Sequence, residues 1–374
     1  MNTKQFKTSQ WIVFVLALSL LGIYCSKSSN PVDSGTSASN ALASPSPSDG
    51  AIGQPNSLSL QWSCIPASGE TLTYDIYLGT TNPPTATIAT GVSQLTVAQS
   101  SLTNLTAYYW QVVAKSSKGT STKGPVWQFT TGIAGMVLVQ GGSFDMGSDS
   151  IDQYSKPVHP VTVSSYFIGK YEVTQKEWRD VVVWKQASAT SPLNPSPATS
   201  KGDSLAVANV SWIDIQTWLS YLNEKEGLTS SSKQYRLPTE AEWEFAARGG
   251  TKSKGYKYSG SNTIDNVAWY ALNSGGTIHA VGKKAPNELG IYDMSGNVEE
   301  WCNDLYADYT SAPQTNPTGP SSGNYCIQRG GLWWGQPSWC QIAYRDWGAA
   351  NARWLVGATT NIYDLLGFRY ARTQ

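Results

Sequence analysis

The segment at 329–340 reads Arg329-Gly330-Gly331-Leu332-Trp333-Trp334-Gly335-Gln336-Pro337-Ser338-Trp339-Cys340, and Tyr344-Arg345 follow it closely. Three tryptophans separated by glycines and a proline do not form a regular helix, so the rest of the chain has to provide the scaffold that holds them. Tryptophans are more often core residues than ligand platforms. Glycines, however, let a backbone or a ligand approach closely. The segment therefore predicts either a packed aromatic core or a binding site, and it does not by itself indicate a chemistry.

Composition and charge limit the classes of partner. The 374-residue chain has 26 Lys+Arg and 26 Asp+Glu, so its formal net charge is zero. Because no basic field exists to attract nucleic acid, we expect no nucleic-acid partner. Charged residues make up only 14% of the chain, whereas tryptophan (16), tyrosine (20) and glycine (34) are abundant. This composition favours an extracytoplasmic, loop-rich fold with an aromatic core.

The first 25 residues are typical of an export signal. Two lysines precede an apolar run at 11–24, which is too short for a membrane span and matches a secretory h-region. Cys25 follows directly, and the segment resembles the bacterial lipoprotein signal, in which this cysteine is acylated and becomes the mature N-terminus. We expect a signal peptide at 1–25, lipidation at Cys25 and anchoring to a bacterial membrane of the cell envelope, at the outer membrane or the surface. Tyr24 departs from the pattern, so cleavage without lipid and a retained anchor are the alternatives.

Residues 26–132 divide into a linker and a small domain. At 26–55 Ser, Pro, Ala, Gly and Asn dominate, and the segment predicts a flexible tether. At 56–132 short runs with period-two alternation predict an all-β sandwich. The run Leu102-x-Asn104-x-Thr106-x-Tyr108-x-Trp110-x-Val112 resembles the tyrosine-corner strand of fibronectin type III domains, with Trp62 as the expected core tryptophan. We expect a spacer or adhesive module without a site of its own.

The rest of the chain, 135–374, predicts one larger domain. Three capping boxes mark helix starts, with the pairs Thr174/Glu177, Ser211/Asp214 and Thr239/Glu242. We expect these helices to end at Val183, at Glu226 and before Gly249. Beyond Gly250, glycine and proline dominate and helices should be scarce. The predicted class is α+β with much irregular structure.

Seven sequence blocks of this domain resemble the formylglycine-generating enzyme family, also called the sulfatase-modifying-factor domain. They occur in family order over some 240 residues, and the resemblance implies the complex variant of the C-type-lectin-like fold. The blocks are Gly141-Gly142-x-Phe144-x-Met146-Gly147, Tyr171-Glu172-Val173-Thr174, Asn209-Val210-Ser211-Trp212, the run from Tyr235 to Gly249, the run from Gly290 to Trp301, Arg329-Gly330-Gly331 and Gly367-Phe368-Arg369.

The resemblance also implies where a copper ion would bind. Active family members oxidise a substrate cysteine to formylglycine with oxygen and a copper ion held by two cysteines after the Arg-Gly-Gly strand. Here the first cysteine position is Gly335 and the second is Cys340. One thiolate does not make the same site for soft Cu(I), so copper is not expected, and Cys340 is the only catalytic candidate if the domain is active.

Calcium is the second cofactor that the resemblance implies. Asp293, Glu300 and the carbonyls of Gly296 and Val298 match the family's calcium positions, and such oxygen ligands suit a structural Ca²⁺. A further calcium loop would begin at Asn266-Val267, although the acidic segment it needs is shortened.

The cysteines suggest one disulfide. An oxidising compartment permits disulfides, and Cys302 with Cys340 is the preferred pair because both lie in aromatic segments of the larger domain. The pairing of Cys64 and Cys326 stays open. No C-x-x-C or His-rich set exists in the sequence, so zinc is not expected.

Three functions are compatible with these features. The preferred one is a surface-anchored, non-catalytic binding or structural module with a protein or glycan partner at the cell surface. The alternatives are a formylglycine-generating oxidase and a carbohydrate-binding protein, since sugars stack on aromatic faces. The expected binding surface consists of Trp301, Trp333, Trp334, Trp339 and Arg345.

Overall fold

The computed structural model describes residues 40–230, 233–353 and 364–374. The predicted signal peptide, Cys25 and the first part of the tether lie outside these residues. None of the helices in the described ranges has the length and apolar character that a membrane crossing requires.

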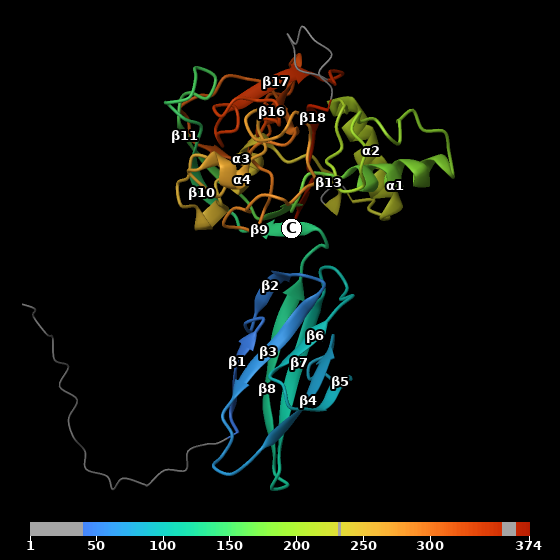
Figure 1. The fold of residues 1–374 in the computed structure, drawn as a ribbon, viewed down its shortest axis with the longest axis vertical. Coiled ribbons are helices and arrows are strands. Elements are labelled where there is room, and N and C mark those ends of the chain that lie inside the picture. The colour runs from blue at the N-terminus through green and yellow to red at the C-terminus, as the bar shows by residue number, and fades with distance from the viewer. Residues whose placement is uncertain (1–39, 231–232, 354–363) are drawn as a thin grey trace, which may run out of the picture. The chain divides into compact units, whose positions relative to one another are not determined.

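The first folded part is the predicted β-sandwich (Figure 1). One sheet has three strands in the order β1 (Leu42–Ser46), β3 (Leu58–Cys64) and β6 (Thr96–Gln99). The other has five, in the order β2 (Ala51–Gln54), β8 (Ser121–Thr131), β7 (Ala107–Ser116), β4 (Leu72–Gly79) and β5 (Thr87–Val92).

Two fibronectin-like features of the sandwich are confirmed. The Tyr108 hydroxyl accepts a hydrogen bond from the Thr103 backbone N–H at 3.0 Å, which is the contact of a tyrosine corner. Trp62 is buried in the core, where its ring meets Tyr74 edge-on with centroids 5.4 Å apart. The local pattern that predicted a fibronectin-type strand therefore identified the correct core.

The predicted tether at 26–55 is too long. Strands β1 and β2 lie inside it, because Leu42 enters the sandwich core and both strands make backbone hydrogen bonds with β3 or β8. This segment has few large apolar side chains, so composition alone did not reveal strands that form mainly through backbone pairing.

The three predicted capping boxes all form in the larger domain. Each cap hydroxyl accepts from the N–H three residues on, and the acidic side chain at that position bonds back to the cap backbone. The helices are α1 (Gln175–Gln186), α2 (Trp212–Lys225) and α3 (Glu240–Ala247), so α1 runs three residues past the predicted end. From Gly250 onward helices are scarce, as predicted: those that the described residues form are the short η2 (Gly250–Lys252) and α4 (Ile264–Val267).

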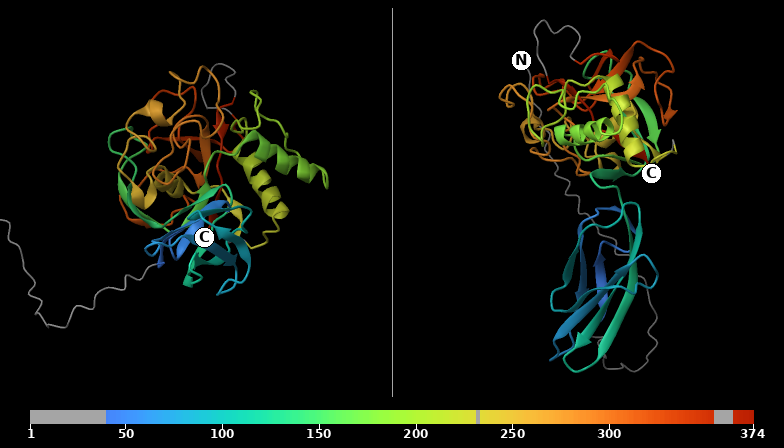
Figure 2. Two further views of the ribbon diagram at one scale, coloured as in Figure 1. Left: turned by 60° about the horizontal axis from the view of Figure 1, so that its bottom comes forward. Right: turned by 90° about the vertical axis from the view of Figure 1, so that its right-hand side faces the viewer.

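Helices α1 and α2 lie side by side in this domain (Figures 1 and 2). Trp178 of α1 and Trp218 of α2 are buried and stack in parallel with centroids 5.8 Å apart. The edge of Phe368 meets the Trp218 ring at 5.3 Å. This aromatic cluster joins the helix pair to the C-terminal segment, and burial of three large rings makes it a main source of stability.

In the described part of the domain, three small sheets complete the fold, as expected for the C-type-lectin-like α+β class. The first has the order β10 (Gly142–Met146), β11 (His159–Val163) and β15 (Gln314–Thr315). The second has the order β13 (Tyr235–Arg236), β19 (Ala371–Thr373), β12 (Tyr166–Gly169) and β9 (Met136–Val139). The third has the order β17 (Arg345–Ala349), β16 (Tyr325–Arg329), β14 (Glu299–Leu305) and β18 (Leu366–Gly367). The third sheet brings the Gly290–Trp301 block against the Arg329 segment.

Candidate functional site

The segment after β16 is folded tightly back on itself. Gly330 and Gly331 both have positive φ, at 98° and 68°. A Cβ on Gly331 would lie 2.7 Å from the Trp339 carbonyl oxygen, so only glycine fits where the backbone at 331 passes the backbone at 339. The Trp333 N–H donates to the Asn297 carbonyl at 2.8 Å and fixes the segment on the Gly-Asn block.

The structure divides the expected binding surface into two groups. Trp301, Trp333 and Arg345 are buried at 0%, 8% and 2% exposure, so their assignment to a surface is wrong. The Trp301 indole donates to the Val210 carbonyl at 3.1 Å, and the Trp333 indole donates to the Asp364 carbonyl at 2.8 Å. Both rings can be buried in the core because the only polar atom of each ring is hydrogen-bonded to a backbone carbonyl there.

Trp334 and Trp339 do reach the surface. Trp334 is 45% exposed, and Leu272 is 79% exposed. The Ala271 N–H donates to the Gly335 carbonyl at 3.0 Å, which brings the Leu272 loop to the tryptophan segment. The half-buried Trp339 has its ring centroid 6.4 Å from those of Trp334 and Tyr344. We call Leu272, Trp334, Trp339 and Tyr344 the apolar face.

The predicted disulfide between Cys302 and Cys340 is wrong. Both thiols are free and buried, as are those of Cys326 and, less deeply, Cys64. Cys302 packs in the core cluster around β11, β12 and α3, whereas Cys340 packs with Tyr258, Tyr270 and residues of α4. Both cysteines lie in aromatic segments of the sequence, but this shared property did not reveal that their side chains enter different clusters.

The position of Cys340 does not fit a copper site. Its side chain is 0% exposed, and burial raises the pKa of the thiol to about 12, so the thiol rather than the thiolate is present at neutral pH. Gly335 has no side chain to contribute, and soft Cu(I) requires thiolate ligands. Among the residues that the structure describes, no group of three or more His, Cys, Asp and Glu side chains is arranged to hold a metal.

Glu300 and Asp293, the predicted calcium carboxylates, already have protein partners. The Glu300 carboxylate forms a two-point ion pair with Arg369, with both N–O distances at 2.6 Å, and it accepts from the Trp243 indole at 2.9 Å. Asp293 accepts from the Gly282 N–H at 2.6 Å. The Arg369 guanidinium thus supplies the positive charge that a calcium ion would bring, and these carboxylates do not fit a calcium site.

Gly296 and Val298 contribute to this region through their amides. The Gly296 N–H donates to the Gly330 carbonyl at 2.8 Å, and the Val298 N–H donates to Glu172 at 3.0 Å. Burial, together with the charges of Asp293 and Glu300, raises the pKa of Glu172 well above its usual value. The block therefore serves as a hydrogen-bonded scaffold under the tryptophan segment.

At the second calcium position a lysine side chain lies in the loop. The Lys284 ammonium donates to the Asp265 carbonyl at 2.7 Å and lies 4.0 Å from the centroid of the Trp269 ring. The Asn266 carbonyl accepts from the Ala285 N–H at 2.9 Å, and Val267 is buried in an apolar cluster. This loop does not fit calcium either, and calcium binding stays a prediction that the contacts do not favour.

A buried ion network lies on the other side of the Arg329 segment. Arg329 bonds Glu240 at 2.8 Å and Glu244 at 2.6 Å, and Arg345 forms two bonds to Glu240, at 2.6 and 2.9 Å. Burial would raise the pKa of Glu240, but the charges of Arg345 and Arg329 outweigh it and hold that pKa below its usual value. Arg345 is therefore a structural residue that joins β17 to the start of α3.

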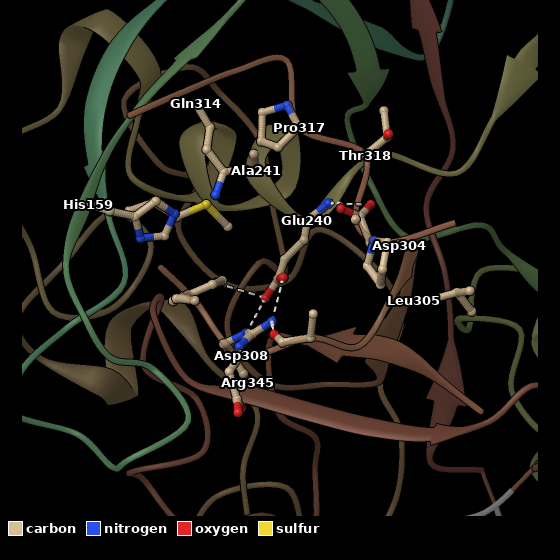
Figure 3. A pocket seen from close by; sticks show the side chains of 15 residues that line it. His159, Glu240, Ala241, Asp304, Leu305, Asp308, Gln314, Pro317, Thr318 and Arg345 are labelled. Carbon is tan, nitrogen blue, oxygen red and sulfur yellow. Dashed lines mark hydrogen bonds and ion pairs between the residues drawn. The ribbon is translucent and has the colours of Figure 1, made fainter. Parts of the chain in front are cut away.

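Next to this network the structure has a cavity of about 300 Å³ that the sequence did not indicate (Figure 3). Its lining includes Glu240, Arg345, His159, Asp304 and Asp308. Asp304 is 4% exposed, and burial followed by the charge of Glu240 raises its pKa to about 8. A cavity lined by a carboxyl group with a perturbed pKa is a typical property of a ligand site. No sequence pattern marked Asp304, because the residues that line the cavity with it come from distant elements, among them β11, α3 and β17.

The fold, together with the segment at 329–345, defines an α+β domain of the C-type-lectin-like class. Residues 124–373 match the family described as Sulfatase-modifying factor enzyme 1-like domain, and the chain belongs to this family.

Three known proteins illustrate the relationship. The chain is 34% identical over 254 residues to Chaperone protein LppX of Paenibacillus barcinonensis, with 56% of this chain and 82% of that protein covered. It is 27% identical over 269 residues to the Formylglycine-generating enzyme of Thermomonospora curvata, with 55% and 84% covered. The solved structure of Treponema denticola variable protein 1 has 31% identity and a TM-score of 0.52, and covers 66% of this chain and 96% of its own.

Proposed function

We propose that the C-terminal domain is a non-catalytic binding module that holds a protein partner on its apolar face. In this proposal the lipid anchor at Cys25 and the β-sandwich position the module at the cell envelope. The observation that carries the proposal is the contrast at one place: where family oxidases hold copper, this chain has Gly335 and a fully buried Cys340, and burial raises the pKa of that thiol. The same segment exposes Trp334 to solvent.

The nature of the apolar face favours a protein as the partner. Exposed leucine and tryptophan side chains that lie together are typical of protein interfaces, and tryptophan is enriched among residues that dominate binding energy. Leu272 and Trp334 are both exposed large apolar residues of the described chain, at 79% and 45%. The name of the Paenibacillus relative, a chaperone protein, also supports a protein ligand.

The absence of oxidase chemistry can be measured directly. With Cu(I), dioxygen, a thiol reductant and a cysteine-bearing sulfatase peptide, we expect no formylglycine, while the Thermomonospora curvata enzyme serves as the positive control. The reason is that one buried thiol with a raised pKa does not provide the two thiolates of a Cu(I) site. Copper-dependent turnover that disappears in Cys340→Ser would contradict the proposal.

Partner binding is expected to depend on the apolar face. The chain would be immobilised, exposed to envelope proteins and to a glycan array, and compared with Trp334→Ser. We expect this variant to capture about tenfold less of the partner protein, or even less than that. Removing an exposed interface tryptophan costs about 2 kcal/mol or more of binding free energy. Tyr325→Ser is the matched control, since Tyr325 is 43% exposed in the same domain. If the chain instead retains a glycan and captures no protein, and Trp334→Ser abolishes that retention, the result would favour the carbohydrate-binding function.

A further inference from the structure

We propose that a second, positively charged cavity of the larger domain binds a ligand that carries a phosphate group, with Arg248 and Lys257 as its cationic residues. The loop at 147–151, the end of α3 at Arg248, the loop at 255–262 and residues 341–343 form this cavity. Its volume of about 470 Å³ lies within the range for small-molecule sites. It shares no lining residue with the cavity of Figure 3, and it does not depend on the function proposed for the apolar face.

Hydrogen bonds hold the walls of this cavity together. The Gly147 carbonyl accepts from Nη2 of Arg248 at 2.8 Å, which joins the loop after β10 to the end of α3. The Lys257 N–H donates to Oδ1 of Asn262 at 2.9 Å, and the Lys257 carbonyl accepts from the Ile342 N–H at 3.1 Å. The cavity is therefore built into the folded scaffold, and both cationic residues belong to walls that are fixed to their neighbours.

The buried ion network reaches this cavity with one positive charge in excess. Its guanidinium groups are those of Arg329, Arg345 and Arg248, whereas its carboxylates are those of Glu240 and Glu244. Glu244 is shared by Arg329 and Arg248, with N–O distances of 2.6 and 2.7 Å. Arg329 and Arg345 are buried, but the Arg248 side chain is 25% exposed. Since an uncompensated buried charge is unfavourable, an anion at Arg248 would stabilise the network.

The lining itself contains cations and no carboxylate. Among the described residues, Arg248 and Lys257 are the charged side chains of the lining, and Asp149 of the same loop is not part of it. The Lys257 ammonium forms no ion pair with a described carboxylate, and Nη1 of Arg248 has no hydrogen bond to a described residue. Asp304, next to the network, does not offset the excess charge, because its pKa of about 8 keeps it mostly protonated at neutral pH. An anion would therefore meet two available cations and no opposing carboxylate.

The uncharged donors of the lining favour a phosphate group over a carboxylate. Ser148 and Ser150 contribute hydroxyl groups, which lie 3.1 Å apart, and Asn262 contributes an amide whose Nδ2 has no described partner. Together with the two cations, these groups offer more donors than the two oxygens of a carboxylate would use. A phosphate group has three strong acceptor oxygens and a charge of about −1.5 to −2 at pH 7, which matches this lining better. Ser150 is exposed, so the ligand can enter from solvent.

Four probes test the proposal: inorganic phosphate, glycerol phosphate, glycerol and acetate, each titrated into the full chain by calorimetry at pH 7 and low ionic strength. We expect both phosphates to bind more tightly than acetate and glycerol. We expect Lys257→Gln to weaken binding of both phosphates about fivefold or more, because hydrogen bonds to charged groups contribute more than neutral ones.

Lys254→Gln is the matched control. Lys254 is exposed in the same region of the chain and lies 5.9 Å from the centroid of the Tyr256 ring, much as Lys257 lies 5.4 Å from that of Tyr258. Lys254 does not line the cavity, so its substitution should leave all four affinities unchanged.

A further variant changes the charge of the lining without removing a cation. Ser150→Glu places a carboxylate at the exposed rim and should weaken both phosphates but not glycerol. Tighter binding of glycerol phosphate than of inorganic phosphate supports an organic phosphate as the ligand, and the reverse order supports free phosphate. The proposal is overturned if neither phosphate binds, if acetate or glycerol binds as tightly, or if Lys257→Gln has no more effect than Lys254→Gln. None of these results would affect the proposed role of the apolar face, which rests on Trp334.

Discussion

Replacing Arg369 with methionine is expected to lower the free energy of unfolding of the C-terminal domain by about 3–5 kcal/mol. Arg369 and Glu300 are both 0% exposed, and the substitution would leave the Glu300 carboxylate buried without its cation. The charge of Arg369 also offsets the nearby carboxyl groups of Glu172 and Asp293. Urea unfolding, followed by tryptophan fluorescence, measures the change.

Arg353→Met is the matched control for this prediction. Arg353 forms a similar two-point pair with Asp214, at 2.8 and 3.0 Å, but its side chain is 52% exposed. Solvent screens such a pair, so we expect a loss of no more than about 1 kcal/mol. Equal losses for the two variants would show that burial does not set the strength of the Arg369 pair.

Gly331→Ala is expected to destabilise the domain by about 2–3 kcal/mol and to displace the apolar face. Gly331 has a φ of 68°, and an added Cβ would lie 2.7 Å from the Trp339 carbonyl oxygen and 3.0 Å from the Cys340 nitrogen. These are backbone atoms, so the turn itself has to shift. Thermal unfolding and iodide quenching of tryptophan fluorescence measure stability and the exposure of the face.

Gly335→Ala, four residues further on, separates this effect from a general intolerance of side chains. Its Cβ would lie 3.1 Å from the Leu332 carbonyl oxygen and 3.2 Å from a Trp339 ring carbon, and its φ is not in the left-handed region. We expect a loss below about 1 kcal/mol. If Gly331→Ala is as mild as this control, the tight turn is not what positions Trp334 and Trp339.

Local signals in the sequence predicted the helices of the larger domain well. The pairs Thr174/Glu177, Ser211/Asp214 and Thr239/Glu242 each satisfy backbone groups within one turn, so a few neighbouring residues are sufficient to define a helix start. The tyrosine corner at Tyr108 was predicted for the same reason, since its hydrogen bond spans five residues.

Predictions that depended on distant contacts were less successful. Trp333 and Trp334 are neighbours in the chain, yet one is buried and the other exposed, because Asn297 and Asp364 hold the first in the core. Cys302 and Cys340 both lie in aromatic segments, but each enters a different cluster. Residue type and spacing do not contain this information, since the partners lie tens to more than a hundred residues away.

The amino-acid sequence by itself determined the family, the order of the domains and the helix starts, because each depends on residue identity at fixed or short spacing. It also predicted that Gly335 stands where the family resemblance implies a copper-binding cysteine. Only the tertiary structure decided that Arg369 pairs with the buried Glu300, that the Leu272 loop is hydrogen-bonded to the Trp334 segment, and that Asp304 lines a cavity with His159. These properties arise when strands and loops from separate parts of the chain are packed together and water is excluded from between them.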